Sequence, residues 1–449
     1  MEHTILADFD RHTGPVKPLN AVNNGPVGGG VRGVGNFADY AALHIPYARL
    51  HDASFFSGYG GEFTVDVHRV FPDFGADETD PASYNFTSTD AYLQNILAAG
   101  TQPFYRLGAS IEHGQKKGTF PPADYEKWAR ICEKILLHYN EGWADGFHMG
   151  IRYAEIWNEP DCRNADGSNP CWQGTEEAFI DFFDVAARYL KGAFPELRIG
   201  GPAFCSVWTP LMEKALKAWG KLGTPLDFVS YHWYGARIAD LRETMRRARE
   251  LCVQAGYGSV ELILNEWNYI RGWLGEDWAY SLRTEKGQKG ASFIAAAMCA
   301  GQPEPLDMLM CYDARPSRMN GLFDTDTYRP LPGYETFRAF AVLAGLEQAV
   351  PVTAEEDAGL YALAAGEGGR GAMLFTRYTD EDTAEDLPVK VCLRGLREGT
   401  RKQVRVSVAA AGQPLTPTRE EIFTAQECAV YLTVPLHAVC LLEILPERE

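Results

Sequence analysis

The chain has 449 residues, of which 46% are hydrophobic and 23% charged, a balance typical of a folded globular protein rather than a disordered one. Lys and Arg total 42 against 60 Asp and Glu, giving a formal net charge of -18. This acidic balance argues against general binding to nucleic acids or anionic membranes, because both require a surplus of basic side chains.

Residues 45–345 alternate short apolar runs with amphipathic, helix-like stretches. The predicted strands are 45–51, 65–71, 102–107, 151–157, 198–202, 227–233, 260–265 and 307–312. The predicted helices are 90–99, 124–139, 175–192, 210–219, 238–255, 287–299 and 333–343. Eight strands alternating with helices predict an α/β fold, a (β/α)8 TIM barrel, which we assign to residues 13–348.

After this region the pattern changes to short alternating runs separated by Gly- and Pro-containing turns. Such a pattern predicts an all-β, sandwich-like accessory domain over residues 349–449, to which residues 1–12 could add a strand. This domain is also a candidate surface for forming a homo-oligomer.

The cysteines and the N-terminus bear on the compartment. Ten cysteines are scattered without a CxxC pair, so we expect reduced and mostly buried thiols. Cys162 and Cys171 are the one pair that could join across a loop. The N-terminus lacks a basic region followed by an apolar one, and no run is long enough to span a membrane, so we expect a soluble, cytoplasmic protein.

Two carboxylates stand out by their position. Glu159 follows the predicted strand 151–157, and Glu266 follows the predicted strand 260–265. Active sites of barrels assemble at the carboxyl ends of the strands, and we place these two acids after strands four and seven. A pair of converging carboxylates suits hydrolysis of a glycosidic bond. The plainer alternative is that each acid is satisfied by a neighbouring Arg or backbone N–H.

The sequence around these acids resembles glycoside hydrolase family 39, which includes β-xylosidases and α-L-iduronidase. The likeness covers residues 40–345 and rests on the two acid segments and on six further ones, Tyr47–Asp52, Asn85–Asp90, Gly100–Phe104, Trp172–Thr175, Gly200–Ala203 and Asp227–Gly235. It implies that Glu159 is the general acid/base and Glu266 the nucleophile, with retention of configuration. It implies no cofactor and no metal ion.

Eight further residues are candidates for contacting the sugar: Asn158, His51, His232, Tyr234, Asp313, Trp172, Arg49 and Arg315. By the resemblance, Asn158 bonds the 2-hydroxyl, and His51, His232 and Tyr234 occupy sugar subsites. Arg49 lies near Glu266 or is a buried partner of Glu155, which we expect to be structural.

The other three candidates lie in loops. Trp172 offers an aromatic face on which a sugar could stack. Asp313 could accept bonds from sugar hydroxyls, and Arg315 could bind the carboxylate of an acidic sugar.

These features predict an exo-acting, retaining glycosidase for terminal glycosides of plant-type oligosaccharides, most similar to β-xylosidases. The alternatives are a glycosidase of the same clan that releases α-L-arabinose or a uronic acid, and a carbohydrate-binding pseudoenzyme without turnover.

Overall fold

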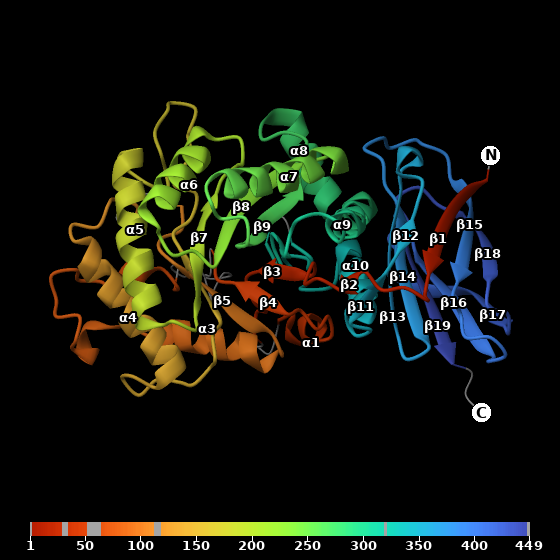
Figure 1. The fold of residues 1–449 in the computed structure, drawn as a ribbon, viewed down its shortest axis with the longest axis horizontal. Helices are drawn as coiled ribbons and strands as arrows, with labels where there is room; N and C mark the ends of the chain where they lie inside the picture. The colour runs from red at the N-terminus through yellow and green to blue at the C-terminus, as the bar shows by residue number, and fades with distance from the viewer. Residues whose placement is uncertain (1, 29–34, 52–63, 112–117, 318–320, 447–449) are drawn as a thin grey trace.

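The computed structural model describes residues 2–28, 35–51, 64–111, 118–317 and 321–446. A closed barrel of eight parallel strands lies beside two β-sheets (Figure 1). The barrel strands are β3 (Ala21–Asn23), β4 (Tyr47–Arg49), β5 (Gln102–Leu107), β6 (Tyr153–Ile156), β7 (Arg198–Phe204), β8 (Phe228–Gly235), β9 (Glu261–Tyr269) and β10 (Met308–Cys311). The predicted TIM barrel with an all-β accessory part is confirmed.

Helices surround the barrel and have readable start and stop signals. They are α1 (Phe37–Ala41), α2 (Val67–Val70), α3 (Thr87–Ala98), α4 (Tyr125–Glu141), α5 (Glu176–Ala193), α6 (Pro210–Leu222), α7 (Ile238–Gln254), α8 (Gly275–Glu285), α9 (Gln288–Gly301) and α10 (Pro332–Ala344). In α5, the Thr175 side chain accepts a bond from the N–H of Ala178, which caps the first turn. Phe179, Phe182 and Phe183 then recur at helical spacing and bury one face against the barrel. None of the described helices is both long and apolar enough to cross a bilayer.

One predicted strand is wrong, and one real strand was missed. Residues 65–71 do not form a barrel strand, because Val67–Val70 is the short helix α2. The first barrel strand is instead β3, which has three residues between polar Asn20 and Asn24 and is too short to show a period. The two errors cancel in the strand count, so Glu159 still follows the fourth barrel strand and Glu266 still lies on the seventh.

The interior of the barrel changes from apolar to polar along its axis. A cluster of Ala21, Phe104, Tyr153, Phe228, Ile263, Met308 and Met310 fills one end. Most of these residues stand near the amino ends of their strands, where side chains pack in layers. Farther along the strands the interior residues are Arg49, Glu155 and Glu266, all buried. The carboxyl end of the barrel therefore concentrates buried charge.

The accessory part is a sandwich of two sheets. One sheet has the order β12-β1-β15-β18 and the other the order β17-β16-β19-β14-β13-β11-β2. Their bounds are β1 (His3–Asp8), β2 (Gly14–Pro15), β11 (Gln348–Val350), β12 (Val352–Thr353), β13 (Leu360–Glu367), β14 (Arg370–Arg377), β15 (Leu387–Arg394), β16 (Lys402–Ala409), β17 (Thr416–Phe423), β18 (Cys428–Val434) and β19 (Val439–Pro446). Strand β1 pairs in parallel with β15, so the N-terminal segment lies within this part (Figure 1).

Helices α9 and α10 lie between the barrel and the sandwich (Figure 1). Every residue of α9 from Lys289 to Gly301 is buried, and most of them are small. Small side chains let the helix backbone approach both the barrel and strands β13 and β14 closely. The sandwich is thus packed on the barrel wall, and its Tyr378 and Asp380 also bond to Ala236 and Tyr269 at the carboxyl ends of β8 and β9.

Candidate active site

Glu159 and Glu266 come together at the carboxyl end of the barrel. A carboxylate oxygen of each and a ring nitrogen of His232 all lie within 4.8 Å of one another. Glu159 is 9% exposed and Glu266 is 5% exposed, so both carboxylates are largely shielded from water. The structure thus brings into contact two acids that are distant in the sequence.

The backbone after β6 aims Glu159 at the site. Trp157 and Glu159 have φ values of 75° and 46°, in the left-handed region that non-glycine residues rarely adopt. The N–H of Glu159 donates to the carbonyl of Ala203 at 3.0 Å, which fixes this turn to β7. Such strained residues persist where the surrounding structure holds them, and they are enriched at active sites.

Arg49 organises the floor of the site. Its Nη1 donates to Glu266 Oε1 at 2.8 Å, its Nη2 to Asn158 Oδ1 at 2.7 Å, and its Nε to Glu155 Oε2 at 2.6 Å. The two predicted positions of Arg49, near Glu266 and paired with Glu155, are therefore both observed. Because all three guanidinium nitrogens of Arg49 are already hydrogen-bonded to protein oxygens, we do not expect a direct sugar contact; the side chain positions Glu266 and Asn158.

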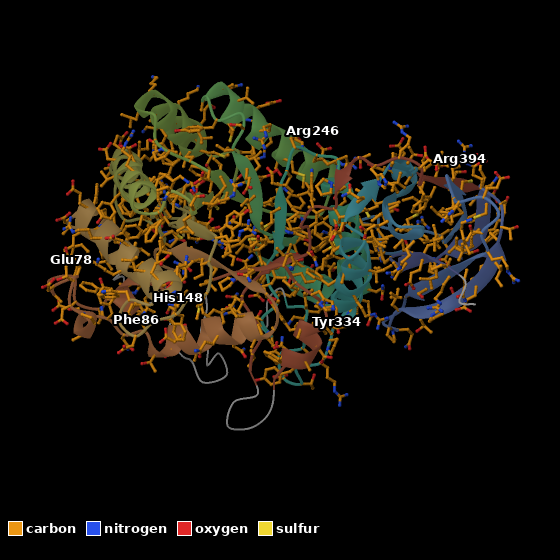
Figure 2. All side chains as sticks on the ribbon, turned by 60° about the horizontal axis from the view of Figure 1, so that its bottom comes forward. Glu78, Phe86, His148, Arg246, Tyr334 and Arg394 are labelled. Atoms are coloured by element: carbon orange, nitrogen blue, oxygen red, sulfur yellow. The ribbon has the colours of Figure 1, made fainter. Side chains whose placement is uncertain are left out.

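Arg49 should also be a major contributor to stability. We expect Arg49→Met to lower the free energy of unfolding by about 3–5 kcal/mol, because it leaves the buried Glu155 carboxylate unpaired. The matched control is Arg394→Met, which removes an exposed guanidinium of the sandwich whose carboxylate partner, Glu427, is exposed as well (Figure 2). We expect that control to change stability by about 1 kcal/mol or less. Urea unfolding measures both, and equal losses would contradict the assigned role.

His232 and Tyr234, from the end of β8, contact the two acids. Nδ1 of His232 is hydrogen-bonded to Glu159 Oε1 at 2.7 Å and lies 3.5 Å from Glu266 Oε2. The hydroxyl of Tyr234 donates to Glu266 Oε2 at 3.0 Å. Burial lowers the pKa of His232 from 6.5 to about 4, so the imidazole is neutral at neutral pH. Burial likewise raises the pKa of Tyr234, which keeps its proton on the hydroxyl.

The lowered pKa of His232 predicts a pH dependence of stability. Between pH 6.5 and about 4 the unfolded chain binds a proton at this residue that the folded chain does not, so stability falls as the pH is lowered. We expect the wild type to lose about 2–3 kcal/mol more than His232→Asn between pH 7.5 and pH 4.5. Unfolding free energies at the two pH values test this, and parallel losses in the two proteins would contradict it.

Of the remaining candidates, His51 lies beside Glu266, whereas Asp313 and Arg315 lie after β10 and contact each other. His51 Nε2 lies 3.4 Å from Glu266 Oε1, so His51 is at the site. Asp313, after β10, is fully buried; it accepts a bond from the side chain of Asn24 at 3.0 Å and lies 3.4 Å from Arg315 Nη2. Arg315 is therefore already paired with a carboxylate of the protein.

Trp172 is not placed to stack on a sugar. Its ring is 1% exposed and packs edge-on against Trp157, with 5.1 Å between ring centroids, and parallel to Phe182. The expectation of a stacking surface fails because the loop that carries Trp172 turns the ring into the aromatic core behind β6. Its role at the site is to support Trp157, two residues before Glu159.

Sequence reasoning also missed part of the surroundings of Glu159. Cys162, Cys171 and Cys205 gather beside it, and the ten cysteines are all free thiols. Interaction with the thiols of Cys171 and Cys205 lowers the pKa of the Cys162 thiol from its usual value. The expected proximity of Cys162 and Cys171 is met without a disulfide. No spacing signal pointed to Cys205, since it comes from the end of another strand, β7.

Comparison with known proteins bears on the family that the sequence resembles. The family model described as glycosyl hydrolases family 39 matches residues 64–254, which confirms the resemblance inferred from the motifs. The matched region includes Glu159 and His232, and Glu266 lies beyond it.

Similar proteins include two curated relatives and a solved structure. A β-xylosidase of Caldicellulosiruptor saccharolyticus is 29% identical over 182 residues, covering 37% of this chain and 36% of the relative. The α-L-iduronidase of Homo sapiens is 29% identical over 175 residues, covering 34% of this chain and 24% of the relative. The structure of a glucosidase from Croceicoccus marinus shares the fold over 100% of both chains, with a TM-score of 0.82 and 20% identity. The matches to the two curated relatives thus span about a third of their length or less.

Proposed function

We propose that the chain is a retaining exo-glycosidase that hydrolyses terminal glycosides of short plant-type oligosaccharides, with β-xylosides as the preferred class. The observation that carries the proposal is the pair Glu159 and Glu266, whose oxygens approach within 4.8 Å in a shielded site. Retaining glycosidases hold their two carboxyl groups about 5–5.5 Å apart, whereas inverting enzymes need about 6.5–9.5 Å to admit a water molecule.

The hydrogen-bond partners of Glu266 and Glu159 support different catalytic roles for the two acids. Glu266 receives hydrogen bonds from Arg49 and Tyr234 on its two oxygens, which suits an anionic nucleophile. Glu159 shares a hydrogen bond with His232, which is neutral at neutral pH and so leaves the carboxyl group free to hold a proton. Two acids with such different surroundings can act in opposite roles.

The reaction then follows in two displacements. Glu159 gives its proton to the glycosidic oxygen while a Glu266 oxygen bonds to the anomeric carbon, and the aglycone leaves. In the second step Glu159 takes a proton from water, whose oxygen displaces Glu266 from the same carbon, so the configuration is retained. Asn158, whose Oδ1 is fixed by Arg49, has an amide N–H with no protein partner among the described residues. That N–H is available to donate to the sugar 2-hydroxyl.

The substrate class is inferred from the relatives. Those reported above are named for xyloside, iduronide and glucoside chemistry. An acidic sugar is less favoured for this chain, since Arg315 already pairs with Asp313. We therefore rank β-xylosides as the most favoured substrate class, followed by α-L-arabinosides and uronosides.

A panel of nitrophenyl glycosides tests the proposal. It contains β-D-xylosyl, α-L-arabinosyl, β-D-galactosyl, β-D-glucosyl and uronosyl donors, with Glu266→Ala as the control for contaminating activity. We expect turnover of the xyloside, and NMR should show the first-formed sugar in the configuration of the substrate. Binding of xylose-type sugars without turnover of any donor or oligosaccharide would favour the pseudoenzyme. A first product of opposite configuration would overturn the retaining mechanism.

The compartment and assembly belong to the same proposal. The ten free thiols fit a reducing compartment, so we place the enzyme in the cytoplasm, acting on imported oligosaccharides. We expect the sandwich to provide the contact surface of a homo-oligomer. Light scattering tests this, and a single species at the chain mass of 49.8 kDa would contradict it.

A further inference from the structure

Three thiols and the proposed acid/base form a compact cluster at one side of the active site. Ligand atoms of Glu159, Cys162 and Cys205 all lie within 4.8 Å of one another. The thiol of Cys171 donates to Glu159 Oε2 at 3.9 Å. The cluster therefore offers two sulfur atoms and one carboxylate oxygen at mutual contact, with a third thiol beside the carboxylate.

The chain holds each member of this cluster in place. The N–H of Cys162 donates to the carbonyl of Glu159 at 3.1 Å, so a tight turn folds the thiol back over the acid. The N–H of Cys171 donates to the Asn169 side chain at 2.8 Å, and the N–H of Cys205 donates to Asp161 Oδ1 at 2.8 Å. The ligands come from three separate turns, and each turn is fixed by its own hydrogen bond.

The chemistry of this donor set points to a soft divalent metal ion. Zinc in proteins takes four ligands in tetrahedral geometry, and cysteine sulfur, histidine nitrogen and carboxylate oxygen all serve as its ligands. Cys162 and Cys205 are partly exposed, so an ion can enter from solvent, whereas Cys171 is buried behind them. The net charge of -18 further favours uptake of a cation.

We propose that Cys162, Cys205 and Glu159, with Cys171 beside them, bind one divalent cation of the zinc class, and that this cation inhibits the enzyme. Glu159 Oε1 contacts His232, and its Oε2 faces the thiols. A metal ion bound to Oε2 occupies the oxygen that would carry the catalytic proton. The binding claim is independent of the proposed hydrolysis, while the inhibition claim rests on it.

Binding is tested on the full reduced chain with Cd2+ as a spectroscopic probe. Kept reduced with a phosphine, the wild type should take up one tightly bound Cd2+ per chain and develop the ultraviolet absorption of cadmium–thiolate charge transfer. Cys162→Ser and Cys205→Ser should each weaken this binding by about tenfold or more. Cys428→Ser, which removes a partly exposed thiol of the sandwich, should bind like the wild type.

Inhibition is measured with Zn2+, relative to the metal-free activity of each variant. We expect the inhibition constant of Cys162→Ser to rise at least as much as its Cd2+ affinity falls.

No charge-transfer band in the wild type, or an equal band in Cys162→Ser, would overturn the site. Inhibition by Zn2+ without such a band would place the ion on Glu159, His232 and Glu266 instead and would also overturn it. A band without inhibition would keep the site and refute its effect on catalysis. An inactive but metal-binding wild type would count against the proposed hydrolysis alone. Thermal melting of each variant checks that it is folded.

Discussion

Replacing Glu266 by alanine is expected to abolish hydrolysis, with a loss in kcat/KM of roughly 10⁴- to 10⁶-fold, as for other enzymes that lose a covalent nucleophile. The reason lies in the contacts of this carboxylate. Arg49, Tyr234 and His51 all face its oxygens, so the carboxylate is held in one orientation, as attack on the sugar requires. The measurement is the hydrolysis rate of the best nitrophenyl donor, with and without added azide. Azide should partly restore turnover and form a glycosyl azide of inverted configuration, because it enters the space left by the carboxylate.

Glu261→Gln is the matched control for this variant. Glu261 begins the same strand, β9, at the opposite end of the barrel, where it contacts Tyr153 and Arg198. Its loss should leave catalysis close to the wild-type level, because those contacts are remote from the catalytic pair. If Glu266→Ala kept near wild-type activity, or if Glu261→Gln lost as much, the nucleophile would have to be another group.

The barrel and the two acids could be predicted from the sequence because their signals are local. A strand buried on both faces must be almost continuously apolar, and the run Leu262–Leu264 shows this. The residues that follow such a strand must stand at the mouth of the barrel, which places Glu159 and Glu266 without knowledge of the tertiary contacts.

The parts that sequence reasoning missed depend on long-range packing. The strand Ala21–Asn23 is too short for any period. In residues 65–71, Val65 and Val67 have the spacing of a strand, whereas Val67 and Val70 have the spacing of a helix. The direction in which Trp172 points is decided by the aromatic side chains of α5, which no local pattern of the loop encodes. The approach of Cys205 to Cys162 depends on a hydrogen bond between two loops: the N–H of Cys205, after β7, donates to Asp161, after β6.

Glu159→Gln is expected to slow hydrolysis by about 10²- to 10⁴-fold on substrates with poor leaving groups, because the amide cannot donate the proton that the departing oxygen needs. The loss should be much smaller for dinitrophenyl glycosides, whose leaving group departs without protonation. The same variant should lose the alkaline limb of the pH profile of kcat/KM, since that limb reports deprotonation of the acid. Steady-state kinetics on a series of aryl glycosides with graded leaving groups measures both effects.

The dependence on the leaving group separates a proton donor from a residue that only shapes the site. Gln is nearly isosteric with Glu and can still accept a bond from His232, so a structural effect would lower the rates of all substrates by a similar factor. A uniform loss would therefore contradict the acid/base role, whatever its size. Added azide gives a second test, because azide needs no general base to attack the glycosyl-enzyme. With dinitrophenyl donors, azide should therefore accelerate turnover of Glu159→Gln and form a glycosyl azide of retained configuration. Azide products of opposite configuration from Glu159→Gln and Glu266→Ala would assign the two carboxylates to opposite faces of the same anomeric carbon, which is the arrangement that double displacement requires.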